Sequence, residues 1–253
     1  MSSKTDYIAV FDSGVGGVSV LRDLVRLLPR ERFIYYGDNK NAPYGTRSEE
    51  EIRALSLDVA NWLLSRDVKA MLVACNTATS AAIQTLRERL SIPVVGMEPA
   101  LKPAYELHAD GKILVLATPA TLRQAKFHRL YERYGEHAVA LPCPELVEFV
   151  ESGRCEGDEI DAYLARRFAD VQGEKLAAAV LGCTHFSFLK KALGRALPGV
   201  PLLDGNEGSA RRLEYLLREN GTLREDGEGS VEFFTSGDED VFLPLMRRLF
   251  AAR

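Results

Sequence analysis

Residues 70–79 read AMLVACNTAT, an apolar run of strand length that stops at Cys75 and is followed at once by small polar residues. A helical pattern of residues then extends from Ser80 to Leu90. A strand that passes directly into a helix is typical of α/β folds. The partial positive charge at a helix N-terminus favours a thiolate over a thiol, so Cys75 is a candidate for chemistry. A single buried cysteine is more often a small apolar side chain, so the assignment needs support from the rest of the chain.

A second stretch repeats this pattern at Cys183. It begins with the strand-like run AAAVLG at residues 177–182, and a helix of about a dozen residues is expected after the cysteine. Pro93 lies 18 residues after Cys75, Pro201 lies 18 residues after Cys183, and each proline marks the next short strand. The equal spacing indicates two related α/β halves. If the halves face each other, the two sulfurs approach one site from opposite sides.

The alternation of strand and helix patterns predicts the α/β class. We expect two pseudo-symmetric parallel-sheet domains of the doubly wound type, with the active site in the cleft between them. The expected strands cover residues 8–11, 33–36, 70–74, 92–96, 112–117, 139–141, 177–182, 201–203 and 231–235. The expected helices cover residues 18–28, 48–66, 80–90, 122–134, 146–151, 156–171, 207–220 and 238–252. A proline-rich interruption at 97–103 indicates a domain boundary, and the tail is expected to pack on the first half because the second already has its strand after Cys183. The first domain is therefore expected at 1–97 plus 208–253 and the second at 98–207.

The composition is that of an ordinary globular chain. Its 253 residues are 46% hydrophobic and 27% charged, with a formal net charge of −4. We therefore expect no nucleic-acid partner, since such partners usually require a basic stripe. We also expect no signal peptide and no membrane span, because the apolar runs are short or interrupted. None of the four cysteines forms a CxxC pair, which argues against a disulfide framework or zinc knuckle and favours the reducing cytoplasm.

Asp12 is a second candidate for chemistry, because it ends a predicted strand and open α/β sheets bind ligands there. The segment DSGVGG at 12–17 has three glycines in four positions, which predicts a tight turn with N–H groups free for an anion. It is not a dinucleotide-binding GxGxxG motif. Inversion of a carbon centre by proton transfer needs a base on one face and an acid on the other. Cys75 and Cys183 suit these roles, with Asp12 and His185 as groups that assist the two thiols.

Four motifs together resemble the glutamate racemases, the cofactor-independent branch of the aspartate/glutamate racemase superfamily. They are Asp12-Ser13-Gly14-Val15-Gly16-Gly17, Tyr36-Gly37-Asp38 with Pro43-Tyr44-Gly45, Cys75-Asn76-Thr77, and Gly182-Cys183-Thr184-His185-Phe186. The resemblance spans about residues 7–210. It implies two-base racemisation of glutamate without pyridoxal phosphate or metal. It also implies a cytoplasmic homodimer that supplies D-glutamate for peptidoglycan, and hence for cell-wall biogenesis and cell shape.

The resemblance also implies roles for single residues. Cys75 would take the α-proton from D-glutamate and Cys183 from L-glutamate, assisted by Asp12 and His185. The implied substrate contacts are Asp12, Ser13, Pro43, Tyr44, Gly45, Asn76, Thr77, Thr121, Glu151, Thr184 and His185. Ser187 departs from the family pattern, which usually has proline there; both residues are tolerated in the first turn of a helix.

Three other functions stay open at this point. An aspartate racemase would use the same thiol pair with a different pocket. A thiol hydrolase would use Cys183 with His185, but residues so close in sequence rarely have nucleophile–base geometry, and Cys75 would be unexplained. A catalytically silent amino-acid-binding module would need neither cysteine. Cys143 and Cys155 match no catalytic motif, and we interpret them as structural or incidental.

Overall fold

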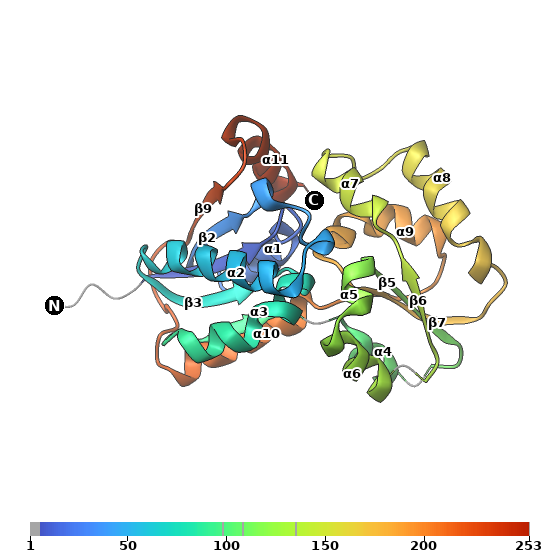
Figure 1. The fold of residues 1–253 in the computed structure, drawn as a ribbon, viewed down its shortest axis with the longest axis horizontal. Coiled ribbons are helices and arrows are strands. Elements are labelled where there is room, and N and C mark those ends of the chain that lie inside the picture. The colour runs from blue at the N-terminus through green and yellow to red at the C-terminus, as the bar shows by residue number, and fades with distance from the viewer. Residues whose placement is uncertain (1–5, 98, 108, 135, 253) are drawn as a thin grey trace. The chain divides into compact units, whose positions relative to one another are not determined.

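The computed structural model describes residues 6–97, 99–107, 109–134 and 136–252. The chain divides into two compact units, Met1–Met97 with Asn206–Arg253, and Glu98–Gly205 (Figure 1). Each unit contains one sheet in which all paired strands are parallel. The predicted α/β class with two parallel sheets is confirmed.

The first unit has a five-stranded sheet in the order β4-β3-β1-β2-β9. Its strands are β1 (Tyr7–Asp12), β2 (Arg32–Gly37), β3 (Val68–Val73), β4 (Val94–Gly96) and β9 (Ser230–Thr235). Strand β3 lies inside the sheet and is buried at every position, as expected for a strand covered on both faces. The tail strand β9 pairs with β2 along its whole length, so the C-terminal segment completes the first sheet.

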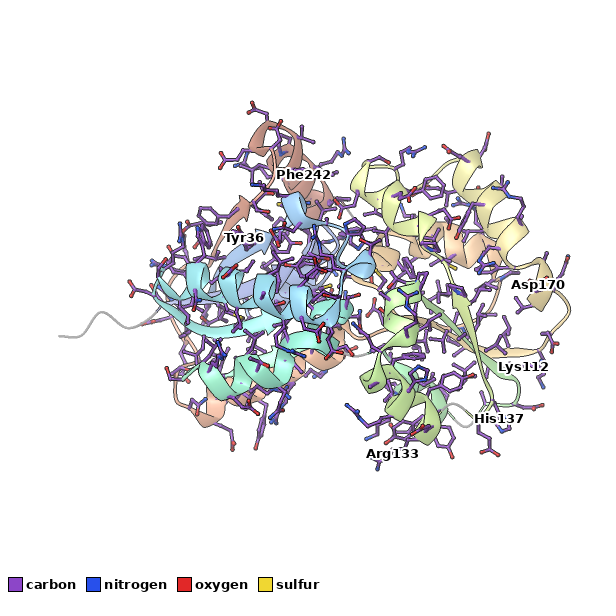
Figure 2. The ribbon with its side chains drawn as sticks, in the orientation of Figure 1. Tyr36, Lys112, Arg133, His137, Asp170 and Phe242 are labelled. Atoms are coloured by element: carbon purple, nitrogen blue, oxygen red, sulfur yellow. The ribbon has the colours of Figure 1, made fainter. Side chains whose placement is uncertain are left out.

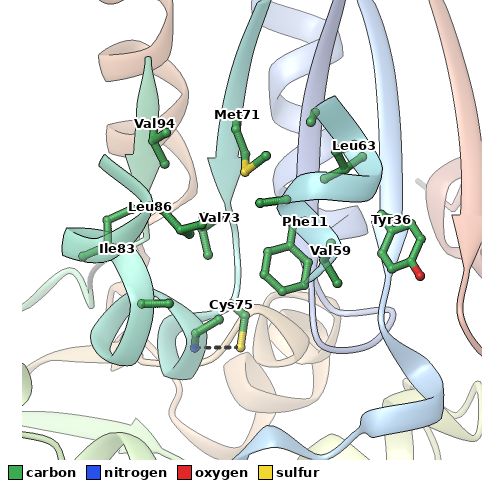
Figure 3. Close-up of a cluster of buried hydrophobic side chains, with 14 of the residues drawn as sticks. Phe11, Tyr36, Val59, Leu63, Met71, Val73, Cys75, Ile83, Leu86 and Val94 are labelled. Carbon is green, nitrogen blue, oxygen red and sulfur yellow. Dashed lines mark hydrogen bonds between the residues drawn. The ribbon is translucent and has the colours of Figure 1, made fainter. Parts of the chain in front are cut away.

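Helices pack on the first sheet in two groups. They are α1 (Val18–Leu27), α2 (Glu49–Leu64), α3 (Asn76–Arg89), α10 (Asn206–Glu219) and α11 (Glu239–Ala251), with 3₁₀ turns η1 (Asn39–Asn41) and η2 (Tyr44–Thr46). α2 packs against α3, whereas α1 packs against α10 and α11. Figure 3 shows the apolar cluster beneath α2 and α3, where Phe11 and Val73 of the sheet meet Val59 and Ile83. Cys75 lies at the end of this cluster.

Local sequence signals account for α2 and its packing. Ser48 and Glu51 form a capping box: the Glu51 N–H donates to Ser48 Oγ at 3.2 Å, and the Ser48 N–H donates to Glu51 Oε2 at 2.9 Å. On the same helix, Trp62 lies against Tyr36 of β2, with ring centroids 4.6 Å apart; Figure 2 labels Tyr36. Trp62 is thus a packing residue of the first unit.

The second unit has a four-stranded sheet in the order β6-β5-β7-β8. Its strands are β5 (Lys112–Ala117), β6 (Ala138–Pro142), β7 (Leu176–Leu181) and β8 (Leu202–Asp204). The helices are α4 (Leu101–Glu106), α5 (Pro119–Arg123), α6 (Ala125–Tyr134), α7 (Glu145–Glu151), α8 (Asp158–Arg167) and α9 (Lys190–Ala196), with 3₁₀ turns η3 (Ala169–Val171) and η4 (Thr184–Leu189). Leu101 of α4 and Phe127 of α6 cover β5 and β7 on one face.

The internal repeat is visible in the hydrogen bonding of the two sheets. The order β4-β3-β1-β2 corresponds to β8-β7-β5-β6, and both β1–β3 and β5–β7 shift register after their first residue pair. The Ala74 N–H donates to Phe11 O at 2.7 Å, and the Gly182 N–H donates to Leu116 O at 2.7 Å. Cys75 and Cys183 each follow these bonded residues directly, so the two cysteines occupy equivalent positions.

The helices after the two cysteines differ from expectation. α3 begins at Asn76 rather than Ser80, because Cys75 itself is the cap of the helix. The stretch after Cys183 is the 3₁₀ turn η4 followed by the short α9, not one helix of a dozen residues. The Phe186 N–H bonds to Cys183 O, three residues back, which is the 3₁₀ pattern.

Two other predicted helices have wrong limits, and the predicted domain boundary contains a helix that was not expected. The helix expected at 122–134 is split into α5 and α6, with Thr118 capping α5. The helix expected at 156–171 ends at Arg167. The proline-rich interruption contains α4, in which Pro103 stands in the first turn, where a backbone N–H is not needed. In the described residues no helix is both long and apolar enough to cross a membrane.

Candidate active site

The first half-site lies at the carboxyl ends of β1 and β3. Asp12 is the last residue of β1, and Cys75 follows β3 by two residues. Cys75 is the N-cap of α3, and its Sγ accepts a hydrogen bond from the Ala78 N–H at 3.4 Å (Figure 3). Because the helix N-terminus carries partial positive charge, this position stabilises a thiolate. The expectation that the sulfur lies at a helix start holds for Cys75.

Ser13 links the carboxylate and the thiol of this half-site. Its Oγ lies 3.3 Å from Cys75 Sγ and 3.5 Å from Asp12 Oδ1, the second distance being at the long limit for a hydrogen bond. Asp12 is fully buried, and its Oδ1 also accepts the Gly14 N–H at 2.9 Å. The resemblance implied a substrate contact for Ser13, and the structure adds that it lies between Asp12 and Cys75.

Gly17 allows α1 to start close to the half-site. A Cβ at Gly17 would lie 2.7 Å from Asp12 Cβ and 3.0 Å from Ala74 Cβ, which no real side chain tolerates. The glycines at 14, 16 and 17 do not adopt positive φ. The predicted tight turn is present at residues 13–17, between β1 and α1, and what requires glycine at position 17 is its close approach to Asp12.

Asn76 and Thr77 form the first turn of α3 beside the thiol, and both are buried. Within the described residues, Asn76 Oδ1 has no hydrogen-bond partner. A buried acceptor without a donor costs about 1–3 kcal/mol. A bound molecule with an N–H or ammonium group would satisfy this oxygen.

Tyr44 is held in the same half-site by a carboxylate that sequence reasoning did not assign. The Tyr44 hydroxyl donates to Asp38 Oδ2 at 2.6 Å, and Tyr44 is 1% exposed. Burial raises the pKa of Tyr44, as do the hydrogen bond to Asp38 and the negative charges of Asp38, Cys75 and Asp12. Tyr44 is therefore a neutral phenol. Asp38 follows the end of β2, so the argument used for Asp12 could have identified it.

The other predicted residues of the loop flank Tyr44. Pro43 is exposed and directly precedes η2, and Gly45 is the middle residue of that turn. Both belong to the first unit with Asp12, Ser13 and Cys75.

The second half-site contains Cys183, His185 and Glu151. Cys183 follows β7, and its Sγ lies 3.5 Å from His185 Nδ1. His185 Nε2 lies 2.6 Å from Oε1 of Glu151, the last residue of α7. Carboxylate, imidazole and thiol thus form a chain within the second unit. The resemblance placed Glu151 in the substrate pocket, and the structure adds its contact with His185.

The charge of His185 follows from its two neighbours. Burial alone lowers the pKa of His185, but the Cys183 thiolate and the hydrogen-bonded Glu151 carboxylate raise it well above its ordinary value. His185 is therefore an imidazolium at neutral pH when Cys183 is a thiolate. The geometric objection to a thiol hydrolase was wrong, because Cys183 and His185 do make contact despite their closeness in sequence.

The two thiols have different surroundings. Cys183 precedes a 3₁₀ turn and makes no capping hydrogen bond through its side chain. The helix argument therefore does not extend to Cys183, whose sulfur contacts the His185 imidazole instead. Ser187, the departure from the family pattern, donates to Asp204 Oδ2 at 2.8 Å and so has a structural role in η4.

Two buried threonines complete the predicted residues of the second unit. Thr184 begins η4, and Thr121 lies in α5, with its Oγ1 3.0 Å from Thr118 Oγ1. Cys143 is fully buried, and burial raises the pKa of its thiol to about 11. A neutral thiol fits the structural interpretation of Cys143. In the part of the chain that the structure describes, no cluster of His, Cys, Asp and Glu is arranged to hold a metal ion.

Replacing Glu151 by glutamine is expected to lower the pKa of His185, because a carboxylate that favours the imidazolium is lost. NMR titration of the histidine ring measures this, and the spectrum of His185→Asn assigns the signal among the four histidines. Glu148→Gln, on the exposed face of α7, is the matched control and should leave the pKa unchanged. An unchanged His185 pKa in Glu151→Gln would show that the contact with Glu151 does not influence the protonation of His185.

The same shift predicts a pH dependence of stability. Because the pKa of His185 is higher in the folded than in the unfolded protein, protonation of His185 favours folding. This contribution is fully present below the unfolded-state pKa and is lost as the pH rises through the folded-state pKa. In Glu151→Gln the loss should occur at lower pH, as measured by urea denaturation across the pH range.

Comparisons with known proteins identify relatives along the whole chain. Residues 8–213 match the family described as Asp/Glu/Hydantoin racemase. A curated glutamate racemase of Clostridium acetobutylicum is 48% identical over 98% of this chain and 99% of its own length. The crystal structure of glutamate racemase from Thermus thermophilus in complex with β-chloro-D-alanine is 40% identical, with a TM-score of 0.82 over 98% of this chain and 94% of that one. Escherichia coli glutamate racemase in complex with L-glutamate and the activator UDP-MurNAc-Ala is 33% identical, with a TM-score of 0.87 over 96% and 95%.

Proposed function

The chain belongs to the Asp/Glu/Hydantoin racemase family and is an isomerase, and we propose that it interconverts L-glutamate and D-glutamate. The family resemblance inferred from the four motifs is confirmed. The observation that carries the choice of glutamate is the 48% identity, over nearly the full length of both chains, to a protein named glutamate racemase. Racemisation of aspartate, by the same superfamily, is the alternative activity against which this proposal is tested.

The proposed reaction uses Cys75 and Cys183 on opposite faces of one bound glutamate. One thiolate removes the α-proton, the C–H bond breaks, and its electron pair is delocalised into the α-carboxylate. The other cysteine then donates its thiol proton to the opposite face of the α-carbon and becomes the thiolate. The equivalent positions of the two cysteines after β3 and β7 support this symmetric exchange of roles. We assign the removal of the proton from D-glutamate to Cys75 and from L-glutamate to Cys183.

The contacts of each thiol indicate which groups assist the gain and loss of its proton. At Cys75 the Ser13 hydroxyl lies between the thiol and Asp12, so Asp12 can influence the thiol through Ser13. At Cys183 the sulfur contacts the His185 imidazole, and Glu151 holds that imidazole in place. The two half-sites thus use different chemistry for the same task.

The proposed substrate contacts are buried polar groups near each thiol. Hydroxyls and backbone N–H groups suit the two carboxylates of glutamate, and they include Ser13, Thr77, Thr121 and Thr184. Asn76 Oδ1, which lacks a partner within the described residues, suits the ammonium group. Pro43, Tyr44 and Gly45 complete the proposed contacts of the first unit.

The proposed biological role is the supply of D-glutamate for peptidoglycan, in the cytoplasm. The similarity to glutamate racemases supports the activity on which this role depends. Racemisation by thiols also needs reduced cysteines, and the four cysteines of the chain are thiols in the structure. The homodimer implied by the resemblance stays a prediction.

Incubation with L-glutamate in D₂O, without added cofactor, tests the function. We expect deuterium to enter at the α-carbon and the circular dichroism of the substrate to decay to zero. Exchange of neither enantiomer would reject the racemase proposal, and exchange of aspartate alone would select the aspartate racemase.

The contact between Cys183 and His185 gives the thiol hydrolase a specific observation in its favour. A hydrolase would leave the equivalent position of Cys75 without a purpose. Release of product from a γ-glutamyl ester or amide, lost in Cys183→Ala but kept in Cys75→Ala, would favour it. The proposed racemase needs both cysteines and should release no product from a γ-glutamyl ester or amide.

A further inference from the structure

We propose that Ser236, in the turn after β9, is a positioning residue that holds Tyr44 in the proposed substrate site through the carboxylate of Asp38. The inference rests on the proposed function, because Tyr44 matters as a contact of glutamate. Ser236 lies beyond residues 8–213, the segment that matches the family, and it was not among the predicted site residues.

Asp38 connects the two ends of this arrangement. It is 2% exposed, and one carboxylate oxygen, Oδ2, accepts the Tyr44 hydroxyl at 2.6 Å. The other oxygen, Oδ1, accepts the Ser236 hydroxyl at 2.6 Å, and Asn41 Nδ2 donates to both at 3.0 and 3.1 Å. Each of these donors is neutral. A buried carboxylate held by neutral donors is sensitive to the loss of any one of them.

The turn that carries Ser236 is fixed against the loop after β2. β9 and β2 pair up to Gly37 and Thr235, and the Ser236 N–H then donates to Gly37 O at 3.1 Å. Ser236 Oγ accepts the Lys40 N–H at 3.1 Å while it donates to Asp38. Thr235 Oγ1 adds a hydrogen bond to Asn39 Oδ1 at 2.8 Å. The position of the Ser236 hydroxyl is therefore determined by the backbone pairing of β9 with β2.

Asp38 also lies next to the catalytic edge of the sheet. Its backbone N–H donates to Asp12 O at 2.9 Å, and Asp12 and Cys75 are close enough for their charges to raise the pKa of Tyr44. Loss of the Ser236 hydroxyl removes the shorter of the two hydrogen bonds to Asp38 Oδ1, leaving the one from Asn41, and loosens the carboxylate that anchors Tyr44. Since Tyr44 binds substrate in the proposed site and transfers no proton, affinity should suffer more than turnover.

Ser236→Ala is expected to raise KM for both enantiomers of glutamate about tenfold, with kcat changed less than about twofold. Ser236→Thr keeps the hydroxyl and should restore KM to near the normal value. Ser230→Ala, at the exposed start of the same strand, is the matched control and should have normal kinetics. Urea unfolding followed by the fluorescence of Trp62, the single tryptophan, checks that each variant is folded.

A double-mutant cycle with Tyr44→Phe separates positioning from general loosening. If Ser236 acts through Asp38 on the Tyr44 hydroxyl, the double variant should lose less affinity than the product of the two single effects. Independent, multiplicative losses would overturn the proposal, as would a normal KM in Ser236→Ala or equal defects in the alanine and threonine variants. A wild-type protein that racemises no glutamate would reject the proposed function itself, which the same assay reveals.

Discussion

Replacement of Cys75 or Cys183 by alanine is expected to lower racemisation of glutamate by about 1,000-fold or more in both directions. The proposed reaction needs a base on one face of the α-carbon and an acid on the other, so neither cysteine can replace the other. Both directions must fall together in kcat/KM, because the equilibrium between enantiomers is unchanged by the enzyme. Chiral analysis of the products, starting from each enantiomer, measures the loss.

Isotope exchange makes this prediction sharper. In Cys75→Ala the remaining Cys183 should still exchange the α-proton of L-glutamate with D₂O, without inversion, whereas D-glutamate should not exchange. The pattern should be reversed in Cys183→Ala. Near-normal turnover in either variant would disprove the two-base mechanism, and exchange of the opposite enantiomer would reverse the assignment of the two cysteines.

Cys143→Ala is the control for the loss of a thiol. Cys143 is buried in the same unit as Cys183, and its raised pKa keeps the thiol neutral. This variant should lose about 1 kcal/mol of stability and racemise within about twofold of the normal rate. A large loss of activity in Cys143→Ala would show that loss of a buried thiol can abolish activity through the structure alone, and the losses at Cys75 and Cys183 would then not establish a role in proton transfer.

Local patterns in the sequence predict the parts of this fold that depend on neighbouring residues. The apolar run before Cys75 becomes β3, and the capping box at Ser48 starts α2. The repeat is predictable because both cysteines follow the same unit of strand and turn. The predicted helix limits are wrong where a side chain caps the helix. At Cys75, the side chain caps α3, which begins at Asn76, four residues before the start that the apolar pattern suggests.

The contacts that organise the two half-sites are the part that sequence reasoning missed. Glu151 and His185 are 34 residues apart, and Asp38 and Ser236 are 198 residues apart. Nothing in the local pattern around Ser236 distinguishes it from any serine in a turn after a strand. Its partner is determined by the pairing of β9 with β2, which is a property of the whole sheet.

The second large effect is expected at a buried ion pair in the first unit. Lys69 Nζ lies 2.6 Å from Glu31 Oε2, and the side chains are 6% and 1% exposed. Lys69 Nζ also donates to Thr222 O at 2.8 Å, and the Arg224 N–H donates to Glu31 Oε1 at 2.8 Å. The pair therefore attaches the segment that leads into β9 to the start of β2 and β3.

Lys69→Met is expected to lower the free energy of unfolding by about 3–5 kcal/mol, because it leaves the Glu31 carboxylate buried without its counter-charge. Urea unfolding followed by Trp62 fluorescence measures the change. Arg211→Met, which breaks the exposed pair with Glu207, is the control and should cost less than about 1 kcal/mol. An equally small cost at Lys69 would show that Glu31 becomes hydrated or protonated when the lysine is removed.

Activity should respond to Lys69→Met differently from stability. Lys69 stands near the start of β3, and Cys75 follows the end of the same strand, so the proposed chemistry does not involve the lysine. While the protein is folded, kcat should stay within about twofold of normal. The tail, however, makes contacts on both sides of β9, with Lys69 and Glu31 before the strand and with Asp38 after it. If the first attachment keeps β9 in register, Lys69→Met should also raise KM for glutamate modestly, and Ser236→Ala should then add little to that increase.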